Sequence, residues 1–179
     1  MEISHWWQKL CQSGLDLLFP PTARSQFVRG LTQQNIADLP QAKKTEPELL
    51  HAAFDYQDKT TRAVVQAAKY DGSRHAAKLM GNALFDEVMT FCQKKRIISK
   101  EIGLVPVPLS NKRLRSRGFN QCRRIITHMI DADNNNNLAE RSVLKKVKST
   151  EPQTRLNQTA RTENLRNCFA LKDEADIHG

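Results

Sequence analysis

Residues 102–121 read IGLVPVPLSNKRLRSRGFNQ, and the predicted fold class depends mainly on this segment. It begins with a short continuous apolar run over residues 102–107, which is typical of a buried strand in a parallel sheet. Pro106 and Pro108 lie at the end of this run and should close it, because proline cannot donate a hydrogen bond to a neighbouring strand. We expect a polar loop over residues 110–118. A helix should follow, with apolar residues at helical spacing: Phe119, Cys122, Ile125, Ile126, Met129 and Ile130.

The flanking segments predict alternating strands and helices. Upstream, residues 50–57 are a strand candidate, and residues 60–69 and 74–93 have the apolar spacing of helices, separated by a turn at Gly72. Downstream, residues 143–147 and 168–171 are short strand candidates, with a helix between them over 153–165. Alternation of this kind favours the α/β class.

The first 48 residues differ in character from the rest. Residues 1–19 form an amphipathic helix candidate that Pro20 ends, and residues 22–48 are polar, without a clear period, and read as a linker. We therefore divide the chain into an N-terminal helix and linker, 1–48, and a domain, 49–179.

The composition excludes several classes of protein. The chain has 179 residues and four widely separated cysteines, so neither a disulfide framework nor a zinc ribbon is expected. It contains no run of 18 apolar residues and no secretory signal pattern, so we expect no membrane span and a cytoplasmic protein with reduced cysteines.

Positive charge is concentrated in the second half of the chain. The net charge is +9, and residues 94–124 alone contain ten basic residues and one acid. Residues 141–166 add seven basic residues and two acids. This distribution indicates an anionic partner, either a phosphate-bearing small molecule or a nucleic acid.

The segment after the apolar run combines several features of an anion site. Lys112, Arg113, Arg115 and Arg117 precede Gly118, which permits a tight turn, and Asn120 and Gln121 begin the next helix. Ligands gather at the carboxyl ends of the strands in open parallel sheets, and arginine can hold two phosphate oxygens at once. These residues fit a solvated basic loop beside a structural helix start equally well, and the two interpretations stay open on the residues alone.

The order of motifs resembles the ComF family of phosphoribosyltransferase-like proteins. The most specific piece is Arg117-Gly118-Phe119-Asn120-Gln121, preceded by Pro106-Val107-Pro108 and Arg113. Upstream, the matching positions are Tyr56, Lys69, Tyr70 and Gly72, and the opening residues 15–21 also look like the start of the family. Downstream, the matching positions are Thr150, Gln153, Leu156, Arg161, Asn164 and Phe169.

The resemblance implies a type I phosphoribosyltransferase-like fold, with phosphoribosyl pyrophosphate (PRPP) and Mg²⁺ as ligands. It assigns pyrophosphate or phosphate contacts to residues of the basic segment and to two outlying cations. These are Lys112, Arg113, Arg117, Gly118, Asn120, Gln121, Lys69 and Arg161. It assigns a flap or substrate-side role to Thr150, Gln153 and Asn164. The alternative role for Lys69 is a cation that stabilises a helix end. The alternative role for Gln153 and Asn164 is a structural hydrogen bond.

Two departures from the family pattern shape the functional expectation. The cysteine-rich zinc module that many members carry is absent, so we expect no zinc and assign no metal-ligating residue. The acidic pair and Thr/Gly-rich turn that hold PRPP in the family find no match before Gly179. We therefore expect a partial domain without its C-terminal strands and without transferase activity of its own.

ComF relatives are associated with natural transformation, so DNA uptake and partners from the competence machinery follow as expectations. A second hypothesis is a non-catalytic protein that binds single-stranded DNA through its basic face, although aromatic residues make up only 6% of the chain. A third is a structural remnant with neither activity.

Overall fold

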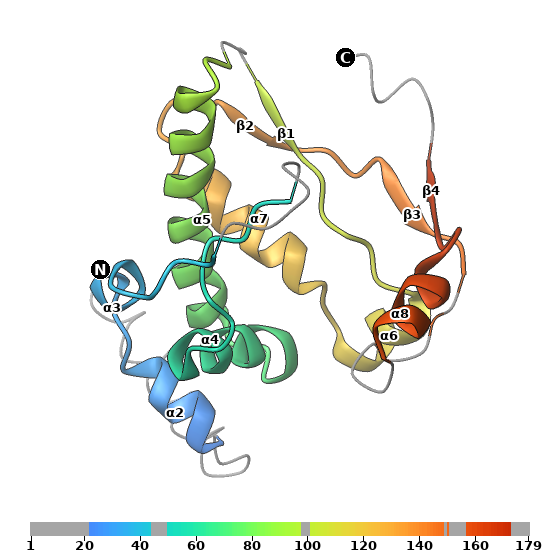
Figure 1. Ribbon diagram of the computed structural model, residues 1–179, viewed down its shortest axis with the longest axis horizontal. Coiled ribbons are helices and arrows are strands. Elements are labelled where there is room, and N and C mark those ends of the chain that lie inside the picture. The colour runs from blue at the N-terminus through green and yellow to red at the C-terminus, as the bar shows by residue number, and fades with distance from the viewer. Residues whose placement is uncertain (1–21, 44–49, 98–100, 149, 151–156, 173–179) are drawn as a thin grey trace, which may run out of the picture.

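The structure is a computed structural model, and it describes residues 22–43, 50–97, 101–148, 150 and 157–172. Elements are labelled as in Figure 1, which shows helices combined with two small sheets. This mixture of helix and sheet agrees with the predicted class at the coarse level. The helix predicted over residues 1–19 lies outside the described residues.

Two short helices occupy the segment predicted as a linker. α2 spans Ala23–Arg29 and α3 spans Gln33–Ala37. Each begins at a threonine, Thr22 or Thr32, whose hydroxyl accepts a hydrogen bond from a first-turn amide, and such caps stabilise helix starts. The linker prediction is therefore wrong over these helices, because capping and the burial of Val28 and Ile36 outweigh the polar composition.

The two helices predicted over residues 60–69 and 74–93 are confirmed. α4 spans Lys59–Tyr70 and α5 spans Arg74–Lys94. Both pack with α2 and α3 around a first core cluster that contains Val28, Ile36, Val64, Ala67 and Leu79. The strand predicted over 50–57 is wrong, because within these residues the backbone pairs only at an isolated bridge between Phe54 and Gln41.

Residues 102–132 form a strand followed by two helices. β1 spans Ile102–Leu104, α6 spans Asn111–Arg117 and α7 spans Gln121–Ala132. After α7 the chain forms β2, Leu138–Glu140, a strand that the sequence did not predict, and β2 pairs with β1 in parallel. The strand prediction is confirmed only for residues 102–104, and β1 is partly exposed, not buried.

Residues 111–117 form a helix, which corrects the loop predicted over 110–118. The Ser110 hydroxyl accepts a hydrogen bond from the Arg113 amide, and the amide of Gly118 donates to the carbonyl of Leu114. Gly118 ends the helix with a φ of 73°, in the left-handed region that favours glycine. The basic side chains therefore project from a helix, and their directions are set by its geometry.

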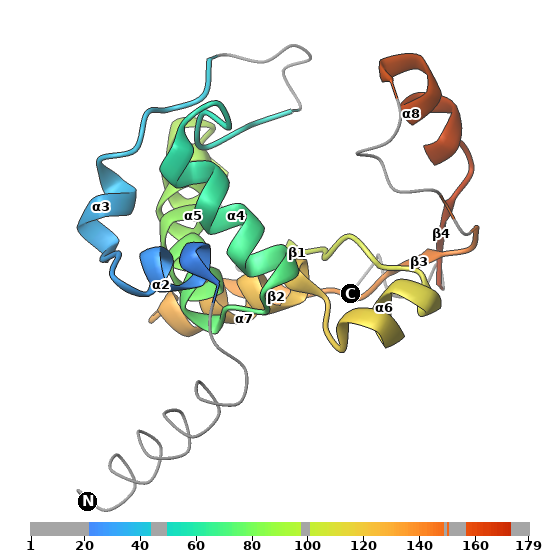
Figure 2. The same ribbon diagram turned by 90° about the horizontal axis from the view of Figure 1, so that it is seen from below.

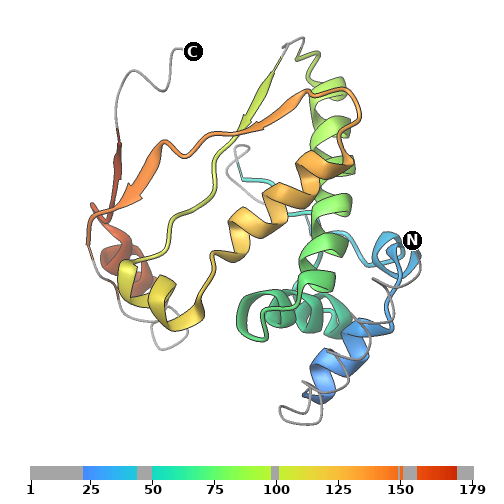
Figure 3. The ribbon, with the colours of Figure 1, turned by 180° about the vertical axis from the view of Figure 1, so that it is seen from behind.

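A second core cluster joins α5, α7, β1 and β2. Its buried residues are Ile126, Met129 and Leu138, and Leu84 and Val88 of α5 pack against them. Figure 3 shows α7 crossing α5. The helices approach so closely at Gly81 that a Cβ atom there would lie 2.6 Å from the Cβ of His128.

The C-terminal described residues form an antiparallel pair of strands, which we call the hairpin, and a helix that lies in the connection between the two strands. β3, Leu144–Lys146, pairs antiparallel with β4, Phe169–Leu171, and α8 spans Gln158–Leu165 between them. The strands predicted over 143–147 and 168–171 are confirmed, as is the C-terminal part of the helix predicted over 153–165. Figure 2 shows the hairpin and α8 on the opposite side of the molecule from α2, α3 and α4.

Across the described residues, no helix combines the length and the apolar character that crossing a membrane requires.

Candidate functional site

Two turns that are distant in the sequence are packed against each other. The α4–α5 turn contains Gly72, whose φ is 66°, and the α6–α7 turn contains Phe119. A Cβ atom at Gly72 would lie 3.3 Å from the Phe119 ring, and Arg124 donates a hydrogen bond to the Gly72 carbonyl at 2.9 Å. The guanidinium carbon of Arg124 also lies 3.7 Å from the centroid of the Phe119 ring. The segments around Lys69 and Arg117 are thereby brought together.

Two cations lie close to the Tyr70 ring at this junction. The Nζ atom of Lys69 is 5.0 Å from the centroid of the Tyr70 ring, and the guanidinium carbon of Arg117 is 5.2 Å from it. Tyr70 is 51% exposed. Within the described part of the chain, no carboxylate forms an ion pair with Lys69 or Arg117. We call Lys69, Tyr70 and Arg117 the Tyr70 cluster.

The amide side chains predicted to contact phosphate are engaged within the protein. Asn120 caps α7, since its Oδ1 accepts from the Cys122 amide at 2.9 Å and its Nδ2 donates to the Val107 carbonyl at 3.0 Å. Gln121 Oε1 accepts from Arg117 Nη1 at 3.3 Å. Burial raises the pKa of the Cys122 thiol. Asn120 thus connects the chain after β1 to the start of α7.

Arg113 is directed to a different partner from Arg117. Its Nη2 donates to the Thr150 carbonyl at 3.2 Å, and Lys146 Nζ donates to the Thr150 hydroxyl at 2.6 Å. Burial lowers the pKa of Lys146, and the charge of Arg113 lowers it further. Arg113 and Arg117 lie one helical turn apart on α6, yet Arg113 contacts the connection that follows β3 and Arg117 contacts Tyr70 at the end of α4.

The remaining predicted residues are spread over the molecule. Lys112 is exposed on α6, Gly118 ends that helix, and Gln153 lies outside the described residues. Arg161 and Asn164 lie on α8, which Figure 2 shows far from α4. Of the predicted phosphate ligands, the structure therefore brings Lys69 and Arg117 together at Tyr70, with Gln121 beside them.

The sequence did not predict a second group of cations, which lines a cleft of about 750 Å³ between α6, α7 and the hairpin. Its basic lining residues come from α7 and from the hairpin with its flanking residue: Arg123, Arg124, Lys145, Lys146 and Lys172. Burial lowers the pKa of Arg124, and the nearby charge of Arg74 acts in the same direction. The sequence predicted a strand over residues 143–147. It did not predict that this strand pairs with residues 169–171, as the structure shows.

In the described part of the chain, no group of three or more His, Cys, Asp or Glu side chains is placed to hold a metal ion. Comparison with protein-family models, with curated proteins and with solved structures found no match to this chain.

Proposed function

We propose that this chain is a phosphoribosyltransferase-like protein of the ComF type, and that the Tyr70 cluster binds a phosphate-bearing ligand. The observation that carries the proposal is the placement of Lys69 and Arg117 about one exposed ring with no carboxylate partner in the described part of the chain. Both cations lie within about 5 Å of the centre of the same exposed ring, so their positive charges add at this place and attract an anion. The arginine fork and the lysine ammonium are the groups that bind phosphate oxygens in proteins.

The order of elements supports the finer part of this proposal, a partial type I phosphoribosyltransferase-like fold. β1 is followed by α6 and α7 and then by the parallel strand β2, which is the connection found in doubly wound sheets. Ligands of such sheets bind outside the carboxyl ends of the strands. Arg117 ends α6, the helix that follows β1, and the α4–α5 turn that follows Lys69 packs against Phe119 and Arg124 just beyond it.

The ligand that the resemblance implies is PRPP, and a role in DNA uptake is part of the same proposal. The cations of the Tyr70 cluster suit its phosphates. Mg²⁺ would normally accompany a diphosphate, but we derive no step through it, because the described residues offer no acidic cluster for the ion. The proposal therefore concerns binding of the phosphorylated ligand and not its transfer.

Equilibrium binding of PRPP and of inorganic pyrophosphate to the full chain tests the proposal. We expect saturable binding that Arg117→Ala weakens about tenfold or more, since a charge-assisted contact contributes about 1.5–3 kcal/mol. Arg115→Ala removes the same charge from the exposed part of the same helix and is the matched control, with a change of about twofold or less. An equal loss in both variants, or no saturable binding, contradicts the proposal.

Single-stranded DNA is the second candidate ligand, and the exposed Tyr70 ring is the observation that favours it. A base can stack on an aromatic ring while adjacent cations hold the backbone, and such stacking contributes about 1–3 kcal/mol per base. Under this alternative, Tyr70→Ala weakens oligonucleotide binding while Tyr70→Phe preserves it. Affinity should also fall steeply with salt concentration. Retention of full oligonucleotide affinity by Tyr70→Ala removes this candidate.

A further inference from the structure

We infer that α2 is a positioning element of the Tyr70 cluster and that Arg24 is the residue through which it acts. The inference rests on the proposed function, because it concerns the geometry of the same site. Asp71 and Gly72 lie in the turn between α4 and α5, directly after Tyr70, and two different helices hold them. α2 contacts Asp71 through Arg24, and α7 contacts Gly72 through Arg124.

The carboxylate of Asp71 accepts hydrogen bonds from three residues at the start of α2. Arg24 Nε donates at 2.9 Å to one carboxylate oxygen, and Arg24 Nη2 donates at 2.5 Å to the other. The hydroxyls of Ser25 and Thr22 donate to the first oxygen at 3.2 Å and 3.4 Å. The Asp71 side chain is only 12% exposed. Both oxygens of this carboxylate are therefore held by the N-terminal end of α2.

Arg24 also contacts α4 one turn before its end. Its Nη1 donates to Gln66 Oε1 at 2.8 Å, and Gln66 lies one helical turn before Tyr70. The guanidinium thus connects α2 to the last turn of α4 and to the residue that follows it. A planar guanidinium supplies donors in this fixed arrangement, whereas the single ammonium of lysine does not. The hydrogen bond from Arg24 lowers the pKa of Asp71, the direction expected for a carboxylate that accepts from a cation.

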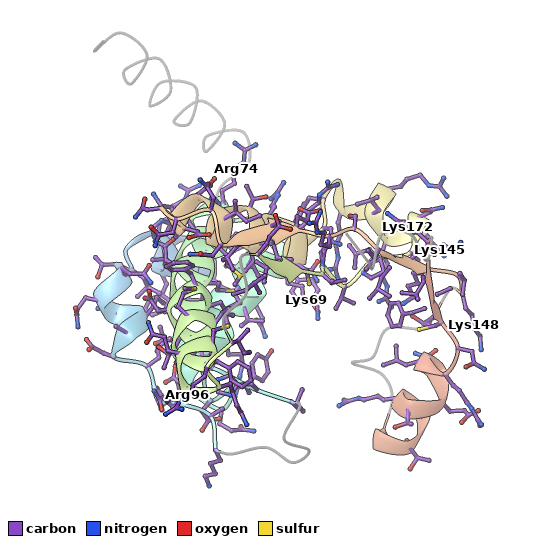
Figure 4. All side chains as sticks on the ribbon, turned by 90° about the horizontal axis from the view of Figure 1, so that it is seen from above. Lys69, Arg74, Arg96, Lys145, Lys148 and Lys172 are labelled. Carbon is purple, nitrogen blue, oxygen red and sulfur yellow. The ribbon has the colours of Figure 1, made fainter. Side chains whose placement is uncertain are left out.

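The position of the Tyr70 ring relative to Arg117 depends on how this turn is held. The contacts of Lys69 and Arg117 with the ring are cation–π contacts at an exposed site, and such contacts are weak. The charge-assisted hydrogen bonds of Asp71 are stronger, and they fix the backbone directly after the ring. Figure 4 shows the side chains of Lys69 and Arg74 well apart, although these residues flank the same turn. The path of the turn therefore determines which of the two cations lies beside Tyr70.

The test follows the Arg117 side chain by NMR in the full chain. In the wild type the Tyr70 ring should shift the signal of the Arg117 Nε–H group, and Tyr70→Leu removes this ring effect and so calibrates it. Arg24→Lys keeps the charge and loses the fork, and it should move the signal at least about half of the way to its value in Tyr70→Leu. Arg29→Lys makes the same replacement at an exposed position of α2 and is the matched control, with no movement expected.

A binding measurement connects this geometry to the ligand. Arg24→Lys should weaken the binding of inorganic pyrophosphate at least about threefold, but less than Arg117→Ala does, because Arg24 acts through the turn and touches no ligand. Arg29→Lys should leave the affinity unchanged. If the wild type binds no pyrophosphate, the proposed function fails, while the Arg117 signal still decides whether Arg24 positions the cluster.

Three results would overturn the inference. The first is an Arg117 signal that keeps its wild-type position in Arg24→Lys. The second is a displaced Arg117 signal with unchanged pyrophosphate affinity, in a protein whose affinity does fall in Arg117→Ala. The third is an equal displacement of the amide signals of Ile126 and Met129 in the second core cluster, because that would show a general structural role for Arg24.

Asp71→Asn tests the same contact from its other partner if Arg24→Lys does not fold. This variant keeps the size of the side chain and removes its charge, so the hydrogen bonds from Arg24 become weaker. The Arg117 signal should again move towards its value in Tyr70→Leu. A signal that does not move in Asp71→Asn would contradict a positioning role for α2.

Discussion

Replacing Gly81 by alanine tests how tightly α5 and α7 are packed. Gly81 is buried on α5, and a Cβ atom added there would lie 2.6 Å from the Cβ of His128 and 2.9 Å from the carbonyl oxygen of Ile125. Both atoms belong to the α7 backbone or its first side-chain carbon, so no flexible side chain can rotate away. The two helices must move apart to accept the methyl group.

The size of the effect follows from two opposing contributions. Alanine favours a helix interior over glycine by about 1 kcal/mol, which alone would stabilise the protein. Overpacking of a tight contact costs about 1–3 kcal/mol and sometimes more, and separating two helix backbones belongs at the upper end. We expect a net loss of about 2 kcal/mol, which for a chain of this length lowers Tm by about 4–8 °C.

Thermal and urea unfolding followed by circular dichroism measure this loss. Gly30→Ala is the matched control, because a Cβ atom at Gly30 meets its nearest atom at 3.5 Å, an ordinary contact, and its φ is −80°. That variant should be neutral or more stable by up to about 1 kcal/mol. A Gly81→Ala protein as stable as the wild type would refute the close approach of α5 and α7.

Three further predictions concern the turns that surround the candidate site. Gly118→Ala should cost about 1–2 kcal/mol in urea unfolding, because Gly118 has a φ of 73° with no atom within 4 Å of its missing Cβ; Gly118→Asn should recover part of this loss. The hydrogen bond from Arg24 lowers the pKa of Asp71, so this pair stabilises the fold above the unfolded pKa of about 4 and loses that contribution as pH falls through the folded pKa. In Asp71→Asn, Tm should therefore fall less as the pH is lowered. An unchanged fall of Tm at acid pH would show that this pair is not its source. Alkylation mapped by mass spectrometry should be slower at Cys122 in the native state than in urea, because burial raises its pKa; equal rates would contradict that burial.

The helices with regular apolar spacing could be predicted from the sequence. α4, α5 and α7 carry alanine, leucine, valine or isoleucine at intervals that place them on one face, and the structure buries Val64, Leu79 and Ile126 there. The boundaries of these helices are also close to prediction. Gly72 lies in the turn between α4 and α5, and Asn120 caps the start of α7.

The short helices were not predicted, because they have too few turns for an apolar period to show. α6 buries none of its residues, and its basic side chains suggest a loop. The overlooked signal is the capping residue, since Thr22, Thr32 and Ser110 each precede one of the missed helices.

The arrangement of cations could be predicted only in part. The sequence places Lys112, Arg113 and Arg117 in one segment. Positions 113 and 117 share one face of α6, yet Arg113 donates to the Thr150 carbonyl and Arg117 lies against the Tyr70 ring. The cleft between α6, α7 and the hairpin depends on strand register and on the position of α7, and neither follows from local composition. The sequence therefore predicts where positive charge is concentrated, but it does not predict which groups each cation contacts.

The lysines of the hairpin have a consequence for how copies of this chain meet one another. Among the described residues, β3 and β4 form a sheet of two strands, so each has an edge open to backbone pairing. Lys145, Lys146, Lys148 and Lys172 place like charges along these edges, and such repulsion opposes edge-to-edge aggregation. Solubility of the protein should therefore fall when high ionic strength screens these charges.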